Sequence, residues 1–213
     1  MDLLRGLFGK KPKMSGELAM RIRQSFEEAA ADEEHFPSSI DPRIFHVQLI
    51  LREFGDLSGK RVLDVGCGKG RFARVLAGEN PDALVVAVDL AEAMLRAAPR
   101  NLGRAAASML ALPFGAGVFD ALYATESLEH AVDIDAAVAE MCRVLKPDGK
   151  IVIIDKNAEH WGKLKTPEWE RWFHRGELEK LLRRHCREVR SQFISYWEDV
   201  PPDGLFLAWI AVK

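Results

Sequence analysis

Short apolar runs alternate with amphipathic stretches through the middle of the chain. RVLDVG, LVVAVDL, DALYAT and IVIID are brief and almost wholly apolar, which is typical of strands buried on both faces. Between these runs, apolar residues recur at helical spacing, so the pattern predicts a parallel sheet covered by helices. The predicted strands cover residues 61–66, 84–90, 120–125 and 151–155, and the predicted helices cover residues 70–79, 91–98 and 135–145.

Two further helices are predicted ahead of the first strand. Ser15 is a suitable N-cap for the first of them. Asp41 and Pro42 form a good N-cap and first-turn pair for a second helix over residues 44–54, and Gly55 follows it as a stop signal. We expect both helices to form one wall of a ligand pocket.

The last part of the chain has a different pattern. Residues 176–185 predict a helix, and the segments 188–197 and 204–213 are joined by a loop containing VPPDG. Two such segments suit an antiparallel hairpin at the edge of the sheet. Thr166 and Pro167 further predict the start of a short helix that ends at Phe173.

Composition limits the number of domains and the kinds of partner. With 213 residues, 48% of them hydrophobic, the chain can form one domain with a substantial core and a small cap. We assign residues 1–58 to an N-terminal helical cap and residues 59–213 to the main domain. The net charge of -2 is spread along the chain without a basic stripe, so no nucleic-acid partner is expected.

The cysteines and the N-terminus bear on location. Three cysteines without a C-x-x-C spacing fit a reducing compartment, and we expect a cytoplasmic protein. The segment MDLLRGLFGKKPK is too short and too interrupted for a signal peptide. It is either a solvated end or an amphipathic segment that makes a peripheral membrane contact. The sequence leaves the oligomeric state open.

A glycine-rich loop follows the first predicted strand. Asp64, Gly66, Gly68 and Gly70 give the spacing G-x-G-x-G with an acid ahead of it, which differs from the G-x-G-x-x-G dinucleotide fingerprint. A carboxylate at the entry of this loop would repel a pyrophosphate and attract an ammonium group. Asp89 ends the second strand, where a carboxylate can bind ribose hydroxyls. A ligand with an ammonium group and a ribose but no phosphate is S-adenosylmethionine.

A set of motifs in order carries a resemblance to a known family. The segments LDVGCGKGRFARVLA, VDLAEAML, LALPFGAGVFDAL, SLEHAVD and RVLKPDGKIVIID resemble the successive motifs of class I S-adenosylmethionine-dependent methyltransferases. The resemblance runs from about Arg61 to Asp155. It implies a Rossmann-like, doubly wound α/β fold with a seven-stranded sheet, mostly parallel, that ends in a C-terminal antiparallel hairpin.

The same resemblance implies a cofactor site. Asp64, Gly66 and Gly68 would contact the methionine part of the cofactor, and Asp89 would contact its ribose. Many relatives have an aspartate that binds the adenine amino group where this chain has Ser108, so a hydroxyl or nearby backbone groups would have to bind adenine here. The expected cofactor-binding residues are Asp64, Gly66, Cys67, Gly68, Asp89, Leu90, Ser108, Met109 and Leu110, with Cys67 as a small buried filler.

The stretch TESLEH, residues 125–130, follows the strand DALYAT. If it turns helically, Glu126, Glu129 and His130 stand on one face, where they would suit Mg²⁺ or another divalent metal. The E-x-x-E-H spacing resembles the ubiquinone-biosynthesis O-methyltransferases, in which the equivalent residues are metal ligands. Two other interpretations remain open: His130 acts as a general base without a metal, assisted by Glu129, or these are helix-start residues with a structural role.

Together these features predict an enzyme that transfers a methyl group from S-adenosylmethionine to a small molecule, most simply to an oxygen of a hydroxylated aromatic or quinol-type acceptor. Aromatic residues near Trp161, Trp169, Trp172 and Phe173 would cover the acceptor or pack structurally. The alternatives are a metal-independent C- or N-methyltransferase and a non-catalytic subunit that only binds S-adenosylmethionine. A nicotinamide oxidoreductase should carry G-x-G-x-x-G, which is absent.

Overall fold

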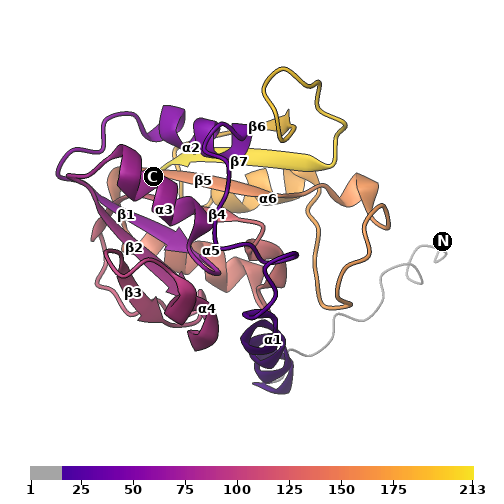
Figure 1. The fold of residues 1–213 in the computed structure, drawn as a ribbon. Coiled ribbons are helices and arrows are strands. Elements are labelled where there is room, and N and C mark those ends of the chain that lie inside the picture. Colours follow the sequence, from indigo (N-terminus) through magenta and orange to yellow (C-terminus); the bar gives the residue numbers. More distant parts are fainter. Residues whose placement is uncertain (1–15) are drawn as a thin grey trace.

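The computed structural model describes residues 16–213, so the predictions for the first fifteen residues, including the Ser15 cap and the membrane-contacting segment, lie outside the described residues. Seven strands form one sheet with helices on both faces (Figure 1). The helices are α1 Gly16–Ala29, α2 Phe45–Phe54, α3 Arg71–Glu79, α4 Glu92–Ala97, α5 Ile134–Val144 and α6 Arg175–Leu182, with short 3-10 helices η1 Leu128–His130 and η2 Ala158–His160.

The sheet has the predicted architecture. Its strand order is β3-β2-β1-β4-β5-β7-β6, and all neighbours from β3 to β5 are parallel. The last two strands form the predicted antiparallel hairpin, and β7 pairs with β5 while β6 lies at the edge. The strands are β1 Arg61–Val65, β2 Leu84–Asp89, β3 Gly103–Ala106, β4 Phe119–Thr125, β5 Leu145–Lys156, β6 Glu188–Ile194 and β7 Phe206–Val212.

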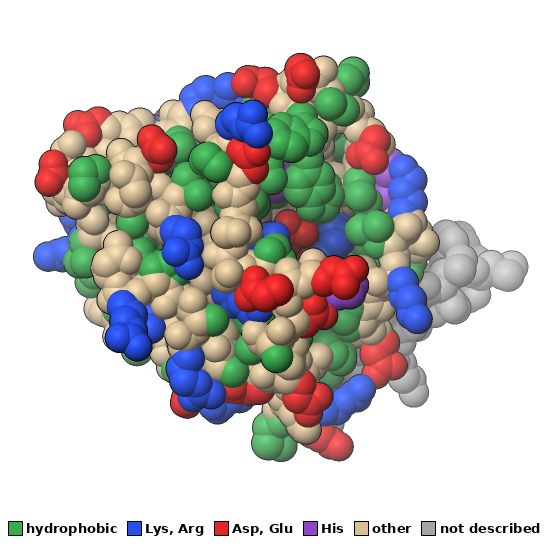
Figure 2. Space-filling view, in the orientation of Figure 1, with side chains coloured by type: hydrophobic (Ala, Val, Ile, Leu, Met, Phe, Trp, Pro, Cys, Tyr) green, Lys and Arg blue, Asp and Glu red, His purple; other side chains and the backbone are tan. Residues whose placement is uncertain are grey.

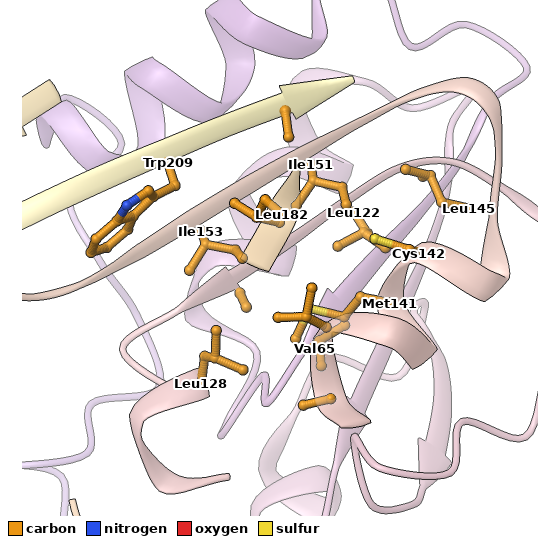
Figure 3. Packing of buried hydrophobic residues seen from close by; sticks show 14 of the residues in the cluster. Val65, Leu122, Leu128, Met141, Cys142, Leu145, Ile151, Ile153, Leu182 and Trp209 are labelled. Atoms are coloured by element: carbon orange, nitrogen blue, oxygen red, sulfur yellow. The ribbon is translucent and has the colours of Figure 1, made fainter. Parts of the chain in front are cut away.

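Alternate residues of the central strands enter two separate cores. On one face, Val65, Leu122 and Ile153 pack with α5 and α6, as Figure 3 shows for part of this cluster. On the other face, Tyr123 and Ile154 pack with α2 and α3. This two-sided burial is the physical reason that these strands are almost continuously apolar in the sequence.

The second helix begins later than its predicted cap. It starts at Phe45, and its N-cap position, Ile44, has no side-chain cap. The Asp41 carboxylate instead accepts hydrogen bonds from the backbone and guanidinium of Arg43. Gly55 ends the helix as predicted, with a φ of 64° and a backbone N–H bonded to the Leu51 carbonyl. The Asp41–Pro42 pair therefore forms a turn ahead of the helix rather than its cap.

The prediction of a helix over residues 166–173 is wrong. This segment is irregular, with a turn in which the Glu170 N–H bonds to the Pro167 carbonyl. Tertiary contacts replace helical hydrogen bonds here, because Phe173 forms a bridge with Asn157 and is buried against Trp209. Burial of the aromatic rings of this segment outweighs its local propensity to form a helix.

The two N-terminal helices are separated in space. α1 contacts α4 near the carboxyl end of the parallel strands, whereas α2 lies in the helical layer against β5 and α3 (Figure 1). The expectation that both helices wall the ligand pocket therefore holds for α1 alone. Among the described residues, no helix has the length and apolar character needed to cross a membrane.

Candidate functional site

A pocket opens at the carboxyl ends of β1, β2 and β4, where open α/β sheets bind ligands. It encloses a cavity of about 360 Å³, within the range of small-molecule sites. Figure 2 shows a hollow in this face of the molecule, with acidic and basic side chains visible inside it. All nine predicted cofactor-binding residues line the pocket. The glycine loop forms one end of it, and the segment around Glu129 forms the other.

The glycine loop follows β1 in a left-handed backbone conformation. Gly66, Gly68 and Gly70 have φ values of 74°, 53° and 73°, which side chains rarely tolerate. A Cβ added to Gly66 would lie 2.4 Å from the Cβ of Ser127, whose hydroxyl donates to the Val65 carbonyl at 2.8 Å. A Cβ at Gly68 would meet no atom within 4 Å. Gly66 therefore allows two loops to approach, and Gly68 leaves room for a ligand.

Asp64 is buried at the entry of this loop. Its side-chain atom Oδ2 has no hydrogen-bond partner among residues 16–213. Burial raises the pKa of Asp64 to about 7, although the nearby Tyr123 hydroxyl acts in the opposite direction. A buried carboxyl group with a free oxygen is ready to bind a cationic ligand, which would restore its charge.

Asp89 holds the glycine loop against the next strand. Its carboxylate accepts hydrogen bonds from the Gly68 N–H at 2.8 Å and the Ala91 N–H at 2.9 Å. Burial raises the pKa of Asp89, while these two backbone donors act against the rise. Each carboxylate oxygen can accept a further hydrogen bond, so Asp89 can hold the loop and bind the hydroxyl groups of a ligand at the same time.

The remaining predicted cofactor residues form the walls of this end. Burial raises the pKa of the Cys67 thiol well above its usual value, which agrees with a filler rather than a nucleophile. The Ser108 hydroxyl accepts a hydrogen bond from the Leu110 N–H at 3.2 Å. Leu90 and Met109 line the pocket as well. The Ser108 hydroxyl remains available to donate to a ligand.

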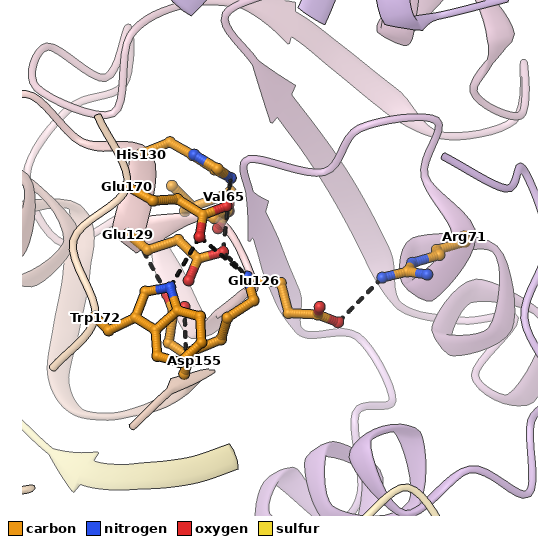
Figure 4. A network of polar contacts seen from close by, with 10 residues as sticks. Val65, Arg71, Glu126, Glu129, His130, Asp155, Glu170 and Trp172 are labelled. Carbon is orange, nitrogen blue, oxygen red and sulfur yellow. Dashed lines mark hydrogen bonds and ion pairs between the residues drawn. The ribbon is translucent and has the colours of Figure 1, made fainter. Parts of the chain in front are cut away.

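The predicted group of Glu126, Glu129 and His130 does not form. Glu126 has a left-handed φ of 50° and forms an ion pair with Arg71 at 3.2 Å, away from the other two residues (Figure 4). Only Leu128–His130 adopts a helical turn, and this turn is a 3-10 helix. The expected i, i+3, i+4 face therefore never arises, because the backbone reverses at Glu126 before the turn begins.

A different cluster surrounds Glu129. His130 Nε2 lies 3.6 Å from Glu129 Oε1 and 3.8 Å from Glu170 Oε1. The ammonium of Lys156 contacts the Glu129 carboxylate and lies 3.6 Å from Glu170 Oε2. Trp172 Nε1 donates to the same Glu170 oxygen at 2.8 Å. Figure 4 shows Glu129, His130 and Glu170 converging at the end of β5, where Asp155 lies. We name Glu129, His130, Asp155, Lys156 and Glu170 the acceptor-end cluster.

Burial governs the charges in this cluster. Burial raises the pKa of Glu129, and the nearby Asp155 carboxylate raises it further. Burial alone would lower the pKa of Lys156, but the carboxylates of Glu129 and Asp155 outweigh it, so the ammonium stays charged. The pKa of His130 is lowered to about 3 by burial and by the Lys156 charge. His130 is therefore a neutral and weakly basic imidazole in the ligand-free protein.

This cluster does not fit a divalent metal. Glu129, His130 and Glu170 each offer a ligand atom within 4.8 Å of the others. However, the ammonium of Lys156 lies against the carboxylate of Glu129 and 3.6 Å from Glu170 Oε2, so the chain itself already supplies a positive charge to both groups. A metal among those oxygens would face a buried positive charge at close range, where repulsion is strong. The predicted ligand Glu126 is also occupied by Arg71.

The pocket is roofed by α1 and the loop that follows it. The Phe26 ring meets His130 edge-on with 5.0 Å between ring centroids. The Glu27 carboxylate accepts hydrogen bonds from the backbone N–H groups of Glu92 and Ala93, which ties α1 to the start of α4. The Lys69 ammonium ties the glycine loop to Glu33 at 2.8 Å. These polar contacts hold α1 and the following loop over the pocket, although few apolar residues of α1 are buried.

The predicted aromatic cover is mostly structural. Trp172 and Phe173 belong to the buried interior, and Trp161 is 57% exposed while it packs edge-on against Trp172. Trp169 alone of the four lines the pocket. Its Nε1 is buried without a hydrogen-bond partner among the described residues.

Sequence reasoning missed several residues that line this pocket. Lys156 had a usable signal, since it is a charged residue at the carboxyl end of the apolar run IVIID. Arg71 directly follows the last glycine of the loop and could have been noted for that reason. Glu170 had no signal, because it lies in an irregular segment and reaches the cluster only through the tertiary fold.

Part of the chain is similar to a known protein family. Residues 63–153 match the family described as "Methyltransferase domain". These residues thus resemble a methyltransferase domain. A malonyl-[acyl-carrier protein] O-methyltransferase of Geobacter sulfurreducens is 36% identical over 135 residues, which are 61% of this chain and 50% of that protein. A ubiquinone biosynthesis O-methyltransferase of Thiobacillus denitrificans is 36% identical over 49% of each chain. The chain thus spans about half the length of these relatives.

Solved structures share the fold of the methyltransferase domain and its flanking elements. The 1,6-didemethyltoxoflavin N1-methyltransferase of Burkholderia thailandensis, solved with S-adenosylhomocysteine, superposes with a TM-score of 0.71. The match covers 93% of this chain and 89% of that one at 24% identity. The sheet with its C-terminal antiparallel hairpin is therefore the arrangement found in methyltransferases.

Proposed function

We propose that this protein transfers the methyl group of S-adenosylmethionine to an oxygen of a small hydroxylated aromatic or quinol-type acceptor. One observation carries the proposal: a single cavity joins Asp64 and Asp89 at one end to the acceptor-end cluster at the other. Such a cavity holds a cofactor and a small acceptor in contact. The names of the curated relatives, which include a malonyl-[acyl-carrier protein] O-methyltransferase and a ubiquinone biosynthesis O-methyltransferase, support oxygen as the methyl acceptor.

In this proposal the cofactor occupies the glycine-loop end. The Asp64 carboxylate binds its ammonium group, and Arg71, which lines the pocket beside the loop, suits its carboxylate. Asp89 binds the ribose hydroxyls with the oxygen lone pairs that Gly68 and Ala91 leave free. Leu90, Met109 and Ser108 surround the adenine. When bound, S-adenosylmethionine supplies an electrophilic methyl group on a sulfonium.

The chain itself contributes mainly orientation and exclusion of water. The roof of α1, with Phe26 over His130, closes the acceptor end and limits solvent. Holding an acceptor oxygen in line with the methyl carbon converts an encounter of two molecules into a local step, which is a major source of rate. His130 forms part of the wall against which the acceptor lies.

Two measurements test this function in sequence. Calorimetry with S-adenosylhomocysteine should give binding to the wild type, and Asp64→Asn and Asp89→Ala should weaken it. Labelled S-adenosylmethionine and a panel of catechols, quinols, amines and carboxylic acids should then yield label in the hydroxylated aromatics. Cofactor binding without transfer to any member of the panel would favour a non-catalytic subunit. Label confined to amines would reject the oxygen acceptor.

A further inference from the structure

The acceptor-end cluster contains a cation that belongs to the chain. Lys156 ends β5, is 7% exposed and lines the pocket. Its ammonium has three N–H donors, and within residues 16–213 its only hydrogen bond is to the Glu129 carboxylate. The next nearest carboxylate oxygen, Glu170 Oε2, is 3.6 Å away, which is an ion pair without a hydrogen bond. The buried Lys156 ammonium therefore has unused hydrogen-bond donors at the pocket wall.

Other unsatisfied polar atoms gather at the same place. Thr125 Oγ1, Glu129 Oε2, His130 Nδ1 and Trp169 Nε1 are all buried without a hydrogen-bond partner in the described part of the chain. All four residues line the pocket. Buried polar groups are normally satisfied, so a group of unsatisfied ones around a cavity points to a polar ligand. An apolar acceptor would leave every one of them unpaired.

We propose that the Lys156 ammonium binds the ionised oxygen of the methyl acceptor and stabilises its negative charge, in place of a divalent metal. Glu129 and Glu170 hold the ammonium in place at the wall of the cavity, and only one of its three donors is engaged, by Glu129. Trp169 supplies a second, neutral donor on the same wall. This proposal rests on the proposed function and assigns its acceptor class as an ionisable hydroxyl, such as a phenol.

The protons and charges of the methyl transfer balance without a metal ion. The acceptor hydroxyl releases its proton to solvent as it binds, and the resulting oxyanion pairs with the ammonium. An oxygen lone pair then forms the bond to the methyl carbon while the carbon–sulfur bond breaks, and its electrons remain on sulfur. The sulfonium becomes a neutral thioether, and the oxyanion becomes a neutral ether. The ammonium keeps its proton throughout and remains paired with the Glu129 carboxylate after the transfer.

4-Nitrocatechol is a suitable probe, because its visible absorption reports whether its hydroxyl is ionised. The experiment titrates it into protein saturated with S-adenosylhomocysteine, in EDTA, at a pH below the probe's own pKa. The wild type should bind the probe in its ionised form. Lys156→Met should bind it about 10-fold more weakly and in its protonated form, since a charge-assisted hydrogen bond is lost. Lys156→Arg should keep the ionised spectrum.

Controls separate this proposal from the proposed function. Lys163→Met removes an exposed lysine of the following segment and should leave probe binding unchanged. S-adenosylhomocysteine affinity, measured on every variant, reports folding and the cofactor end. If Lys156→Met does not fold, the double variant Glu129→Gln/Lys156→Met removes the ion pair as a unit and should show the same loss.

Three results would overturn the proposal: no probe binding to wild type, ionised binding retained in Lys156→Met, or wild-type binding that requires added Mg²⁺ and disappears in EDTA. With S-adenosylhomocysteine binding intact, any of these rejects the role of Lys156 alone. A wild type that fails to bind S-adenosylhomocysteine would instead reject the proposed function.

Discussion

The two ends of the pocket are built in different ways. The glycine-loop end comes mainly from three short stretches, residues 64–69, 89–90 and 107–110, each at or directly after the end of a parallel strand. The acceptor-end cluster combines η1, the end of β5 and an irregular segment near residue 170. The first depends on backbone conformation within one loop, and the second depends on side chains that meet only after folding. Substitutions should therefore act on the two ends independently.

Substitution of Gly66 should perturb the glycine-loop end more severely than substitution of Gly68. Gly66→Ala should lower the free energy of unfolding by about 3 kcal/mol, because its Cβ would collide with Ser127 and its φ is positive. Gly68→Ala has the same φ problem but open space around it, so it should cost about 1 kcal/mol. Urea denaturation of both variants measures the difference. Equal losses would mean that the approach of the two loops has no energetic consequence.

Asp89 tests the cofactor contacts of this end. Asp89→Ala removes an acceptor of two backbone N–H groups and, in the proposed function, of the ribose hydroxyls, so S-adenosylhomocysteine should bind roughly 100-fold more weakly. Calorimetry gives the affinities. Asp82→Ala, which removes an exposed acid ahead of the same strand, is the matched control and should bind like the wild type. A loss below about 3-fold in Asp89→Ala would contradict the assignment of this residue.

Asp64 should make cofactor binding depend on pH, if it binds the cofactor as proposed. Its pKa is about 7 in the ligand-free protein, whereas a bound ammonium favours the ionised carboxylate. Binding below pH 7 therefore releases a proton, and affinity for S-adenosylhomocysteine should rise about 10-fold from pH 6 to pH 8 and level off above it. Calorimetry across this range measures the slope. In Asp64→Asn the affinity should be weaker and the slope absent, and a persistent slope would assign the proton to another group.

Glu129 should show the smallest effect on the cofactor. Its carboxylate binds Lys156 at the other end of the pocket and shares no partner with Asp89. Glu129→Gln should therefore change S-adenosylhomocysteine affinity by less than about 2-fold, and combining it with Asp89→Ala should give additive free energies. A coupling above about 1 kcal/mol in this double-mutant cycle would show that the two ends act as one unit.

The amino-acid sequence by itself determined the sheet and the glycine-loop end. Strands buried on both faces need nearly continuous apolar residues, and this requirement is visible in RVLDVG or IVIID without knowledge of neighbours. The left-handed loop needs glycines at fixed positions, and Asp64 and Asp89 occupy the ends of consecutive strands. Such local requirements can be read from a few adjacent residues.

Only the tertiary structure decided the acceptor end. Glu126, three residues from Glu129, turns away because a left-handed backbone directs it to Arg71. Glu170 joins the cluster from a segment whose predicted helix does not form, because its aromatic neighbours are buried against the sheet. The cation also comes from outside the TESLEH stretch, since Lys156 projects from β5, the neighbour of β4. Charge balance at a buried site depends on which distant groups fold together, and spacing along the chain does not encode it.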